Sequence, residues 1–268
     1  MMNPAVSSPL PFARDELAQM RVRYERDGFL QIESLTTAED ISRIRSLIDP
    51  LFERFDTLGS SAVDLGGPRD HSTPPRQPED NDTIKLAPEL RKTKAYARCR
   101  EIARALLGVP VGHIFDHAIY KPPHNNTATA WHQDAVYKQG PVPLRAVNFW
   151  IPLQPATIEN GCMWYLPGSH LAGLQPHHVI HLRPGGETAD TRGKSFAMDS
   201  VDESRAVPCP VALGGATAHD PLNAHYAGAN TTDGWRRAWI LHFGAFGKLR
   251  HLLHPNSVTA RLRAIANR

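Results

Sequence analysis

The chain has little cysteine and no long hydrophobic run. Its three cysteines, Cys99, Cys162 and Cys209, are spread through 268 residues without a CxxC pair. An odd, sparse set argues against a disulfide framework and favours a reducing cytoplasm, and we expect each cysteine to be a small buried residue. No stretch approaches the roughly 20 apolar residues of a membrane-spanning helix. The N-terminus lacks a basic region followed by an apolar run, so we expect neither a membrane anchor nor a secretory signal.

The sequence also lacks an excess of charge of either sign. Thirty Lys and Arg residues against 27 Asp and Glu give a formal net charge of +3, and no dense basic run accompanies it. This balance argues against a nucleic-acid partner and is compatible with an acidic small molecule. Hydrophobic residues make up 41% and charged residues 21% of the chain, as in ordinary globular proteins. We expect a small-molecule substrate and a monomer or homodimer.

Helical patterns come first along the chain, and short strand-like segments follow. Residues 1–13, rich in Pro and Ser, predict a flexible arm, and residues 14–268 predict a single domain. Helices are expected over 14–27, 41–55 and 90–107. Strand-like segments lie at 29–32, 114–120, 130–136, 144–153, 162–166, 206–211, 216–219 and 237–243. This order favours a mainly β fold, a two-sheet jelly roll with N-terminal helices packed on one sheet.

Two stretches interrupt this pattern. Residues 58–82 are polar, rich in Gly and Pro and without periodicity, and residues 183–207 carry Pro184-Gly185-Gly186 and many charges. Long structureless segments in compact domains are usually functional lids or disordered loops. We favour lids over the mouth of a site, with plain disordered loops as the alternative.

A histidine–carboxylate triplet is the first sign of chemistry. On a strand, residues i and i+2 share a face, so His132 and Asp134 would project to one side with Gln133 turned away. His225 follows about ninety residues later. Two histidines and one carboxylate are the ligand set of a non-haem Fe(II) site. Because the chain has 14 histidines, the triplet alone is weak, and a hydrogen-bonded His and Asp in a loop is the competing interpretation.

Further motifs occur in a fixed order around this triplet. They are Tyr24-x2-Asp27-Gly28-Phe29, Lys121-Pro122-Pro123, Trp131-His132-Gln133-Asp134, Trp150-Ile151-Pro152-Leu153, Asn160-Gly161, Pro167-Gly168-Ser169-His170, and then His225, Asn230 and Arg236. Together they resemble the phytanoyl-CoA dioxygenase family of Fe(II)/2-oxoglutarate oxygenases. The resemblance covers roughly residues 14–245, and it implies a double-stranded β-helix, a cupin-like jelly roll.

The resemblance assigns the cofactors and their ligands. It implies Fe(II) held by His132, Asp134 and His225, with three open positions for 2-oxoglutarate and O2. It also implies that Arg236 holds the far carboxylate of 2-oxoglutarate, since an arginine offers a bidentate fork. Strand alternation cannot separate Arg236 from its neighbour Arg237. The first would share a face with Ala238 and Ile240, the second with Trp239 and Leu241.

Other positions match the family less securely. Trp150 would lie beside the cosubstrate or be a core aromatic. Lys85 would reach the cosubstrate or substrate, or be a surface lysine. Gln133 would lie near the substrate mouth, while for His117 we favour a satisfied core histidine over a cosubstrate neighbour. One departure is Ala227, where the family often has a small hydroxyl residue. His219 is a competing second histidine ligand, and we expect His170, His177, His178 and His181 to be structural or surface residues.

The implied reaction couples decarboxylation of 2-oxoglutarate to succinate with hydroxylation of an unactivated C–H bond. Because Asp134 is present, hydroxylation is favoured over halogenation, for which related enzymes carry a small residue in its place. Desaturation, cyclisation and epoxidation use the same triad and remain open. A metal-binding barrel without 2-oxoglutarate would not need Arg236. The lack of a fixed acyl-CoA signature favours a tailoring enzyme of secondary metabolism.

Overall fold

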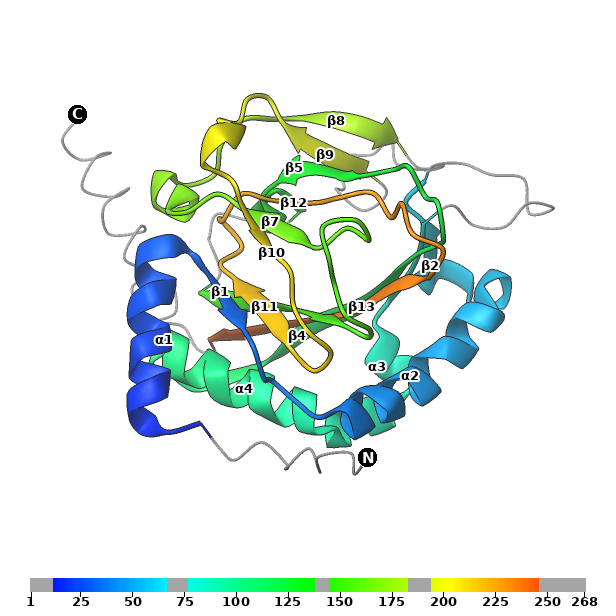
Figure 1. Ribbon diagram of the computed structural model, residues 1–268, viewed down its shortest axis with the longest axis horizontal. Helices are drawn as coiled ribbons and strands as arrows, with labels where there is room; N and C mark the ends of the chain where they lie inside the picture. Colours follow the sequence, from blue (N-terminus) through cyan, green and yellow to red (C-terminus); the bar gives the residue numbers. More distant parts are fainter. Residues whose placement is uncertain (1–11, 67–76, 138–144, 183–193, 246–268) are drawn as a thin grey trace, which may run out of the picture.

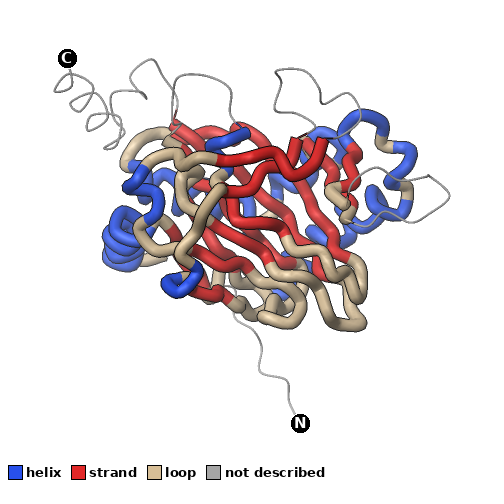
Figure 2. Tube along the Cα trace, turned by 90° about the horizontal axis from the view of Figure 1, so that it is seen from above, coloured by secondary structure: helices blue, strands red, loops and turns tan. Residues whose placement is uncertain are grey.

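The computed structural model describes residues 12–66, 77–137, 145–182 and 194–245, and antiparallel sheets form its centre (Figures 1 and 2). The larger sheet has seven strands in the order β1 (Phe29–Ile32), β11 (Ala216–His219), β6 (Ala146–Pro152), β13 (Arg236–Ala245), β4 (Val111–Lys121), β3 (Pro78–Asn81) and β2 (Ala62–Asp64). The smaller sheet has the order β10 (Val207–Cys209), β7 (Met163–Tyr165), β12 (His225–Ala227) and β5 (Thr129–His132). These two sheets confirm the jelly-roll prediction.

The helices cover one face of the larger sheet. They are α1 (Arg14–Asp27), α2 (Ala38–Glu53), the short α3 (Thr83–Leu86) and α4 (Lys94–Leu107), and α4 packs against β4, β6 and β13 (Figure 1). Local signals set their ends. Thr37 caps α2 by accepting a hydrogen bond from the Asp40 backbone N–H, and Gly28 ends α1 with a positive φ of 80°. Within the described residues, no helix is long and apolar enough to cross a membrane.

The two faces of β13 belong to different cores. Trp239, Leu241 and Phe243 join the apolar cluster that packs against the helices. Ala238 and Ile240 join a smaller cluster between the two sheets, which also contains Trp150. Because side chains alternate along a strand, this arrangement decides which face of the large sheet can carry a site. The face turned toward the smaller sheet is called the inner face below.

Part of the first expected lid is regular secondary structure. The described parts of residues 58–82 form the 3-10 turn η2 (Gly59–Ser61) and the strands β2 and β3, which extend the large sheet beside β4. The sequence pattern missed β3 because its buried residues are Pro78, Glu79 and Asp80, whose polarity hides the strand period. Residues 67–76 lie outside the described part of the chain.

The second expected lid also contains strands. Within residues 183–207 the structure places β9 (Lys194–Met198), which pairs with β8 (His177–Leu182) in a separate hairpin, and the start of β10. The hairpin lies on the side of the molecule away from α4 (Figure 1). Residues 183–193 lie outside the described part, as do residues 1–11 of the expected arm. A lid role for these segments stays a prediction.

Candidate active site

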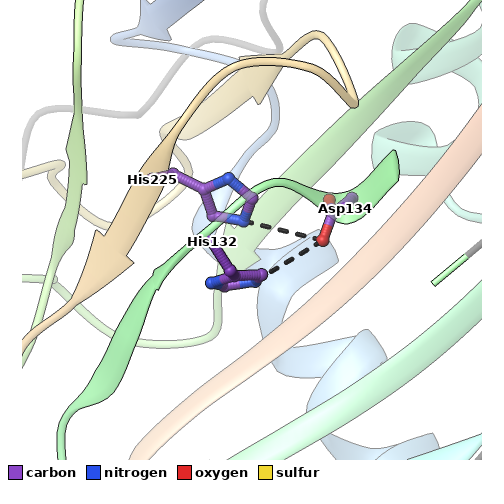
Figure 3. Close-up of side chains that lie close together, drawn as sticks. All are labelled: His132, Asp134 and His225. Atoms are coloured by element: carbon purple, nitrogen blue, oxygen red, sulfur yellow. Dashed lines mark ion pairs between the residues drawn. The ribbon is translucent and has the colours of Figure 1, made fainter. Parts of the chain in front are cut away.

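His132, Asp134 and His225 come together at the edge of the smaller sheet (Figure 3). His132 and His225 are register partners on β5 and β12. Nε2 of each histidine lies 3.6 Å from Oδ1 of Asp134, and one ligand atom from each residue lies within 4.8 Å of the others. Among the described residues, this is the group whose geometry could hold a metal ion. Strand alternation is not what aligns them, because β5 ends at His132 and Asp134 opens the 3-10 turn η4 (Asp134–Tyr137).

Backbone hydrogen bonds fix how both imidazoles are presented. Nδ1 of His132 lies 2.8 Å from the Ala130 carbonyl oxygen, and Nδ1 of His225 lies 2.9 Å from that of Asn223. A carbonyl only accepts, so each Nδ1 carries the proton and each Nε2 keeps its lone pair for a metal. A hydrogen bond on the second nitrogen is the usual way in which proteins orient histidine ligands.

The charge state of the cluster also suits a metal ion. Burial lowers the pKa of His225 well below its usual value, and the neighbouring His132 lowers it further. Burial raises the pKa of Asp134, but the surrounding His225, His132 and His219 outweigh it, so this pKa lies well below the usual range. Metal ligands must be neutral imidazoles and ionised carboxylates, and these shifts favour both states.

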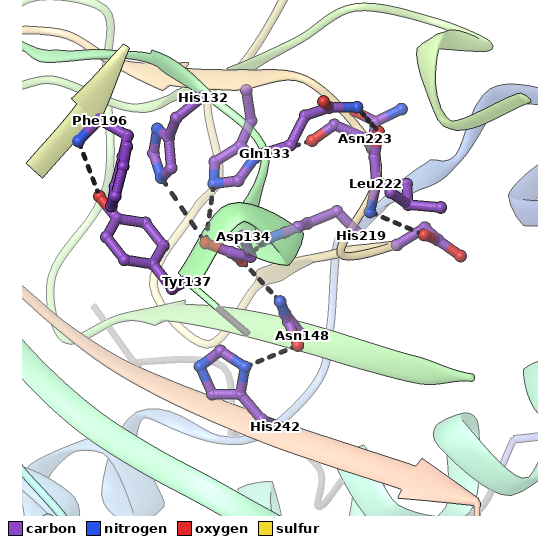
Figure 4. A network of polar contacts seen from close by, with 12 residues as sticks. His132, Gln133, Asp134, Tyr137, Asn148, Phe196, His219, Leu222, Asn223 and His242 are labelled. Atoms are coloured by element: carbon purple, nitrogen blue, oxygen red, sulfur yellow. Dashed lines mark hydrogen bonds and ion pairs between the residues drawn. The ribbon is translucent and has the colours of Figure 1, made fainter. Parts of the chain in front are cut away.

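The second carboxylate oxygen of Asp134 points away from the histidine ligands. It lies 3.0 Å from Nε2 of His219 and 2.5 Å from Nδ2 of Asn148 (Figure 4). His219, the competing ligand of the sequence interpretation, therefore contacts the carboxylate and is outside the metal-binding group. Sequence reasoning missed Asn148, because its place depends on the register between β6 and β11, which no local pattern encodes.

Arg236 is a buried cation on the inner face. It is 2% exposed, its guanidinium lies 5.5 Å from the centre of the Trp150 ring, and its Nε has no hydrogen-bond partner among the described residues. Burial lowers the pKa of Arg236 to about 10. Its register partner Lys121 is also buried and donates to the backbone oxygens of Gly228 and Thr127 at 2.8 and 3.2 Å. An unpaired buried charge is costly, so this end of the site favours an anion.

Arg237 lies on the other face of β13. Its Nε lies 3.4 Å from Oδ1 of Asp49 on α2, and its guanidinium lies over Tyr120 at 5.5 Å and Trp235 at 5.9 Å. The protein itself thus provides a carboxylate and aromatic faces for Arg237. The structure separates two arginines that strand alternation left equivalent.

Gln133 and Lys85 lie differently from what the family pattern suggested. Gln133 is fully buried, and its side-chain amide donates to the carbonyls of Gly173 and Leu222 and accepts from the Gln175 N–H. These bonds use the side chain as an internal brace. The Lys85 side chain is 74% exposed and forms an ion pair with Asp82, the arrangement expected of a surface lysine. The geometry supports a substrate or cosubstrate contact for neither residue.

His117 lies on the inner face, in register with Ile240 of β13. Its Nδ1 lies 2.6 Å from Oε1 of Glu79 on β3, and its side chain is 16% exposed. Burial lowers the pKa of His117, but the hydrogen bond to Glu79 and the charges of Glu79 and Asp134 outweigh it and raise the net value. His117 is thus hydrogen-bonded, as the core interpretation predicts, and close enough to Asp134 to sense its charge.

The β8–β9 hairpin lies beside β5, the strand that carries His132. Nδ1 of His177 donates to the Gln175 carbonyl at 2.7 Å, which leaves its Nε2 to accept the backbone N–H of Gln133 at 3.2 Å. On β9, the Phe196 ring lies 5.3 Å from Tyr137, which in turn lies 6.2 Å from the His132 ring (Figure 4). An aromatic pair therefore borders the site beside His132.

Two of the ordered motifs, at Gly161 and Asn230, stabilise the chain around the strands of the site. Gly161, with φ 86°, lies so close to the Gly228 carbonyl that a Cβ would stand 2.3 Å from its oxygen, so only glycine fits. The Asn230 side-chain amide donates to the carbonyls of Lys121, Pro122 and Gly234. These contacts hold the chain between β12, which carries His225, and β13, which carries Arg236.

Comparison with known proteins agrees with this geometry. The family model of phytanoyl-CoA dioxygenase (PhyH) matches residues 24–238. The Bos taurus phytanoyl-CoA dioxygenase domain-containing protein 1 is 26% identical over 82% of this chain and 87% of that protein. The Mus musculus peroxisomal phytanoyl-CoA dioxygenase is 27% identical over 85% of this chain and 68% of that protein.

Solved structures show the same fold. EvdO2 from Micromonospora carbonacea, complexed with 2-oxoglutarate, is 36% identical with a TM-score of 0.70 over 85% of this chain and 90% of that one. The epimerase SnoN, in complex with Fe3+, alpha ketoglutarate and nogalamycin RO, shares the fold at 21% identity, with a TM-score of 0.66 over 87% of this chain and 85% of that one. The chain belongs to the phytanoyl-CoA dioxygenase family of non-haem iron, 2-oxoglutarate-dependent oxygenases.

Proposed function

We propose that this chain is an Fe(II)/2-oxoglutarate-dependent dioxygenase that hydroxylates an unactivated C–H bond of a small-molecule metabolite. One observation carries the proposal. A cluster of two imidazoles and a carboxylate stands above the inner face of the large sheet, and the same face buries Arg236, which has no counter-ion among the described residues. A metal and a carboxylate-bearing cosubstrate would satisfy both.

His132, Asp134 and His225 would hold the iron, since they offer two Nε2 lone pairs and one carboxylate oxygen. This is the ligand set that proteins use for non-haem Fe(II), and it would leave positions open for the cosubstrate and O2. When bound, the iron with 2-oxoglutarate and O2 supplies the oxidation of the substrate and the decarboxylation to succinate. The protein keeps the ligands in their metal-binding protonation states and orients them through the backbone of β5 and of the turn before β12.

Arg236 and Trp150 would receive the cosubstrate. Register links them to the metal cluster, because Trp150 pairs with Ile240 of β13 and lies two residues from Asn148, which holds Asp134. The far carboxylate of 2-oxoglutarate would replace the missing counter-ion of Arg236, and the Trp150 ring would exclude water beside it. Ala227 itself offers no hydroxyl, and Arg236 would be the charged partner of that carboxylate.

Substrate binding would involve the aromatic pair Tyr137 and Phe196. Phe196 lies in the region that the sequence suggested as a lid, and its ring contacts Tyr137. The hydrogen bond between His177 and the Gln133 backbone connects this hairpin to the chain directly after β5. We further propose that the protein works in a reducing cytoplasm, since its three cysteines are free and buried, and that it acts in secondary metabolism.

Anaerobic titration with Fe(II) and 2-oxoglutarate tests the proposal. We expect the intact protein to develop the visible metal-to-ligand charge-transfer band of chelated 2-oxoglutarate. His132→Ala should lose the band, and Arg236→Ala should lose it at limiting cosubstrate. Arg237→Ala is the matched control, because it removes the neighbouring arginine from the opposite face and should keep the band.

An intact protein that gives no band at saturating iron and cosubstrate would exclude this function. A band lost equally in the Arg236 and Arg237 variants would remove Arg236 from the cosubstrate site. For the substrate, a panel of candidate metabolites scored by succinate release would identify the acceptor. The product mass would then separate hydroxylation, a gain of one oxygen atom, from desaturation or cyclisation, a loss of two hydrogen atoms.

A further inference from the structure

The two oxygens of the Asp134 carboxylate have different surroundings. Oδ1 lies 3.6 Å from Nε2 of His132 and from Nε2 of His225, so it faces the point that all three residues share. Oδ2 is occupied by two donors, Nε2 of His219 at 3.0 Å and Nδ2 of Asn148 at 2.5 Å. Only one oxygen of this carboxylate is therefore presented to a metal.

The two donors belong to one row across the large sheet. His219 on β11 is the register partner of Asn148 on β6, and Asn148 is the register partner of His242 on β13. All three are buried, with exposures of 2%, 0% and 7%. Asp134, by contrast, begins a turn outside any strand. The row thus attaches a ligand on a turn to three central strands.

Neighbouring hydrogen bonds determine which atoms of the row can donate. Oδ1 of Asn148 lies 2.6 Å from Nδ1 of His242 and accepts its proton, so the Asn148 NH2 group must point toward Asp134. Nδ1 of His219 lies 3.2 Å from the Tyr165 hydroxyl, which can donate to it when the Thr217 hydroxyl at 2.6 Å donates to Tyr165. His219 then carries its proton on Nε2, facing Asp134 (Figure 4).

We propose that His219, Asn148 and His242 form a positioning row that keeps Asp134 a one-oxygen ligand of the metal. This inference rests on the proposed function. If Oδ2 were free, the carboxylate could rotate and bind through both oxygens, filling a position that cosubstrate and O2 require. Two hydrogen bonds to a buried carboxylate are charge-assisted and therefore strong. Such outer-shell partners typically change metal affinity about 10- to 100-fold.

His219 could instead be a fourth ligand, the alternative that the sequence raised. Its ring lies 4.4 Å from that of His225, so a small rotation would bring it toward the metal. The bond to Tyr165 and the bond to Asp134 both oppose that rotation. The two roles predict different losses, because a ligand cannot be replaced by an amide donor whereas a positioning donor can.

The test measures Fe(II) affinity anaerobically in the full-length protein, with His219→Leu, His219→Gln and Asn148→Ala variants. We expect roughly 10- to 100-fold weaker Fe(II) binding for the Leu and Ala variants, and affinity close to wild type for His219→Gln, whose amide can still donate. With iron and 2-oxoglutarate at saturation, nitric oxide should give the electron paramagnetic resonance signal of a third open position in the intact protein. That signal should weaken in His219→Leu.

Tyr165→Phe is a milder second variant, because it removes one hydroxyl and keeps the ring. We expect several-fold weaker Fe(II) binding, since His219 loses the partner that holds its proton on Nε2. Thermal unfolding of each variant shows whether it is folded, and Asn148→Ala and Tyr165→Phe test the row if His219→Leu does not fold.

Wild-type affinity in both His219→Leu and Asn148→Ala would overturn the row while leaving the proposed function intact. A loss in His219→Gln as complete as in His132→Ala would make His219 a ligand and would also overturn it. Failure of the intact protein to bind iron or to form the charge-transfer band would reject the proposed function itself, so the two failures are distinguishable.

Discussion

The two faces of the large sheet surround their adjacent arginines in opposite ways. On the helix-covered face, Arg237 has a carboxylate and two aromatic rings, and the Trp239 indole donates to Asp116 at 3.1 Å. On the inner face, Arg236 is more deeply buried and pairs with no carboxylate among the described residues. The protein supplies a carboxylate to Arg237, whereas the charge of Arg236 is left for a ligand to balance. The presence or absence of a counter-ion therefore distinguishes the arginine of the helix-covered face from that of the inner face.

Replacing each of the two adjacent arginines with glutamine should give the largest difference in 2-oxoglutarate affinity between variants. Arg236→Gln should weaken 2-oxoglutarate binding roughly 100-fold or more, because truncating one partner of a buried charge pair costs about 2–5 kcal/mol. Without cosubstrate, the same variant should be at least as stable as wild type, since it removes an uncompensated buried charge. Titration of the charge-transfer band and urea unfolding measure the two quantities.

Arg237→Gln should show the reverse pattern. The partly exposed pair with Asp49 contributes up to about 1 kcal/mol, so unfolding free energy should fall slightly while 2-oxoglutarate affinity stays unchanged. If Arg237→Gln weakened cosubstrate binding as much as Arg236→Gln, the difference between the faces would not hold.

Trp239→Phe tests the helix-covered face alone. The indole is fully buried, and its loss leaves the Asp116 carboxylate with one donor fewer and a small cavity beside it. We expect a loss of about 1–3 kcal/mol in unfolding free energy, read from denaturant unfolding. The folded fraction should keep wild-type Fe(II) affinity, because Trp239 points away from the inner face. Weakened iron binding in fully folded protein would show that the helix-covered face also shapes the site.

The sequence could predict the residues that carry chemistry better than those that position them. His132, Asp134, His225 and Arg236 occur in local motifs at spacings typical of a known family, and the structure brings the first three together. Asn148 was missed, and His219 was named only as a competing ligand, because cross-strand register brings these two residues together from distant segments. The prediction that His132 and Asp134 share a strand was wrong, since the strand ends between them.

The prediction of the fold was likewise better for features set by local sequence patterns than for features set by distant contacts. Apolar periodicity located α2 and α4, and a helical pattern ending at Gly28 located α1. β3 was missed because Glu79 and Asp80 occupy buried positions. Lys85 and Gln133 matched family positions, yet the structure places one in solvent and makes the other an internal brace. Motif matching locates a residue in the chain, but the direction of its side chain depends on neighbours that the motif does not contain.

Phe196→Ala tests whether the aromatic pair beside His132 affects substrate binding separately from cosubstrate binding. The ring packs against Tyr137 beside His132, whereas the cosubstrate would be held by Arg236 and Trp150. Because an aromatic pair contributes about 0.5–1.5 kcal/mol, we expect the KM of the accepted substrate to rise up to about tenfold. The affinity for 2-oxoglutarate should not change. Ile180→Ala, at an exposed position of the neighbouring strand, is the control and should leave both constants alone.

Asp80 is a buried carboxyl on the helix-covered face, and it gives the smallest expected effect. It is fully buried and in register with Ala118 of the helix-facing core. Burial raises the pKa of Asp80, opposed by Ser61 and Thr83 and reinforced by the charges of Asp116 and Glu79. A carboxyl whose pKa is raised by folding binds its proton more tightly in the native state. Stability is therefore lost as pH rises from the ordinary pKa of an aspartate through the raised one.

Asp80→Asn should remove this dependence, because an amide resembles the protonated carboxyl and does not titrate. We expect the variant to exceed wild type in unfolding free energy by about 1 kcal/mol or less at pH 8, and to match it near pH 4. Unfolding at the two pH values, with wild type measured in parallel, gives the difference directly. A variant that is less stable at pH 8 would mean that the ionised Asp80 stabilises the sheet beside Asp116.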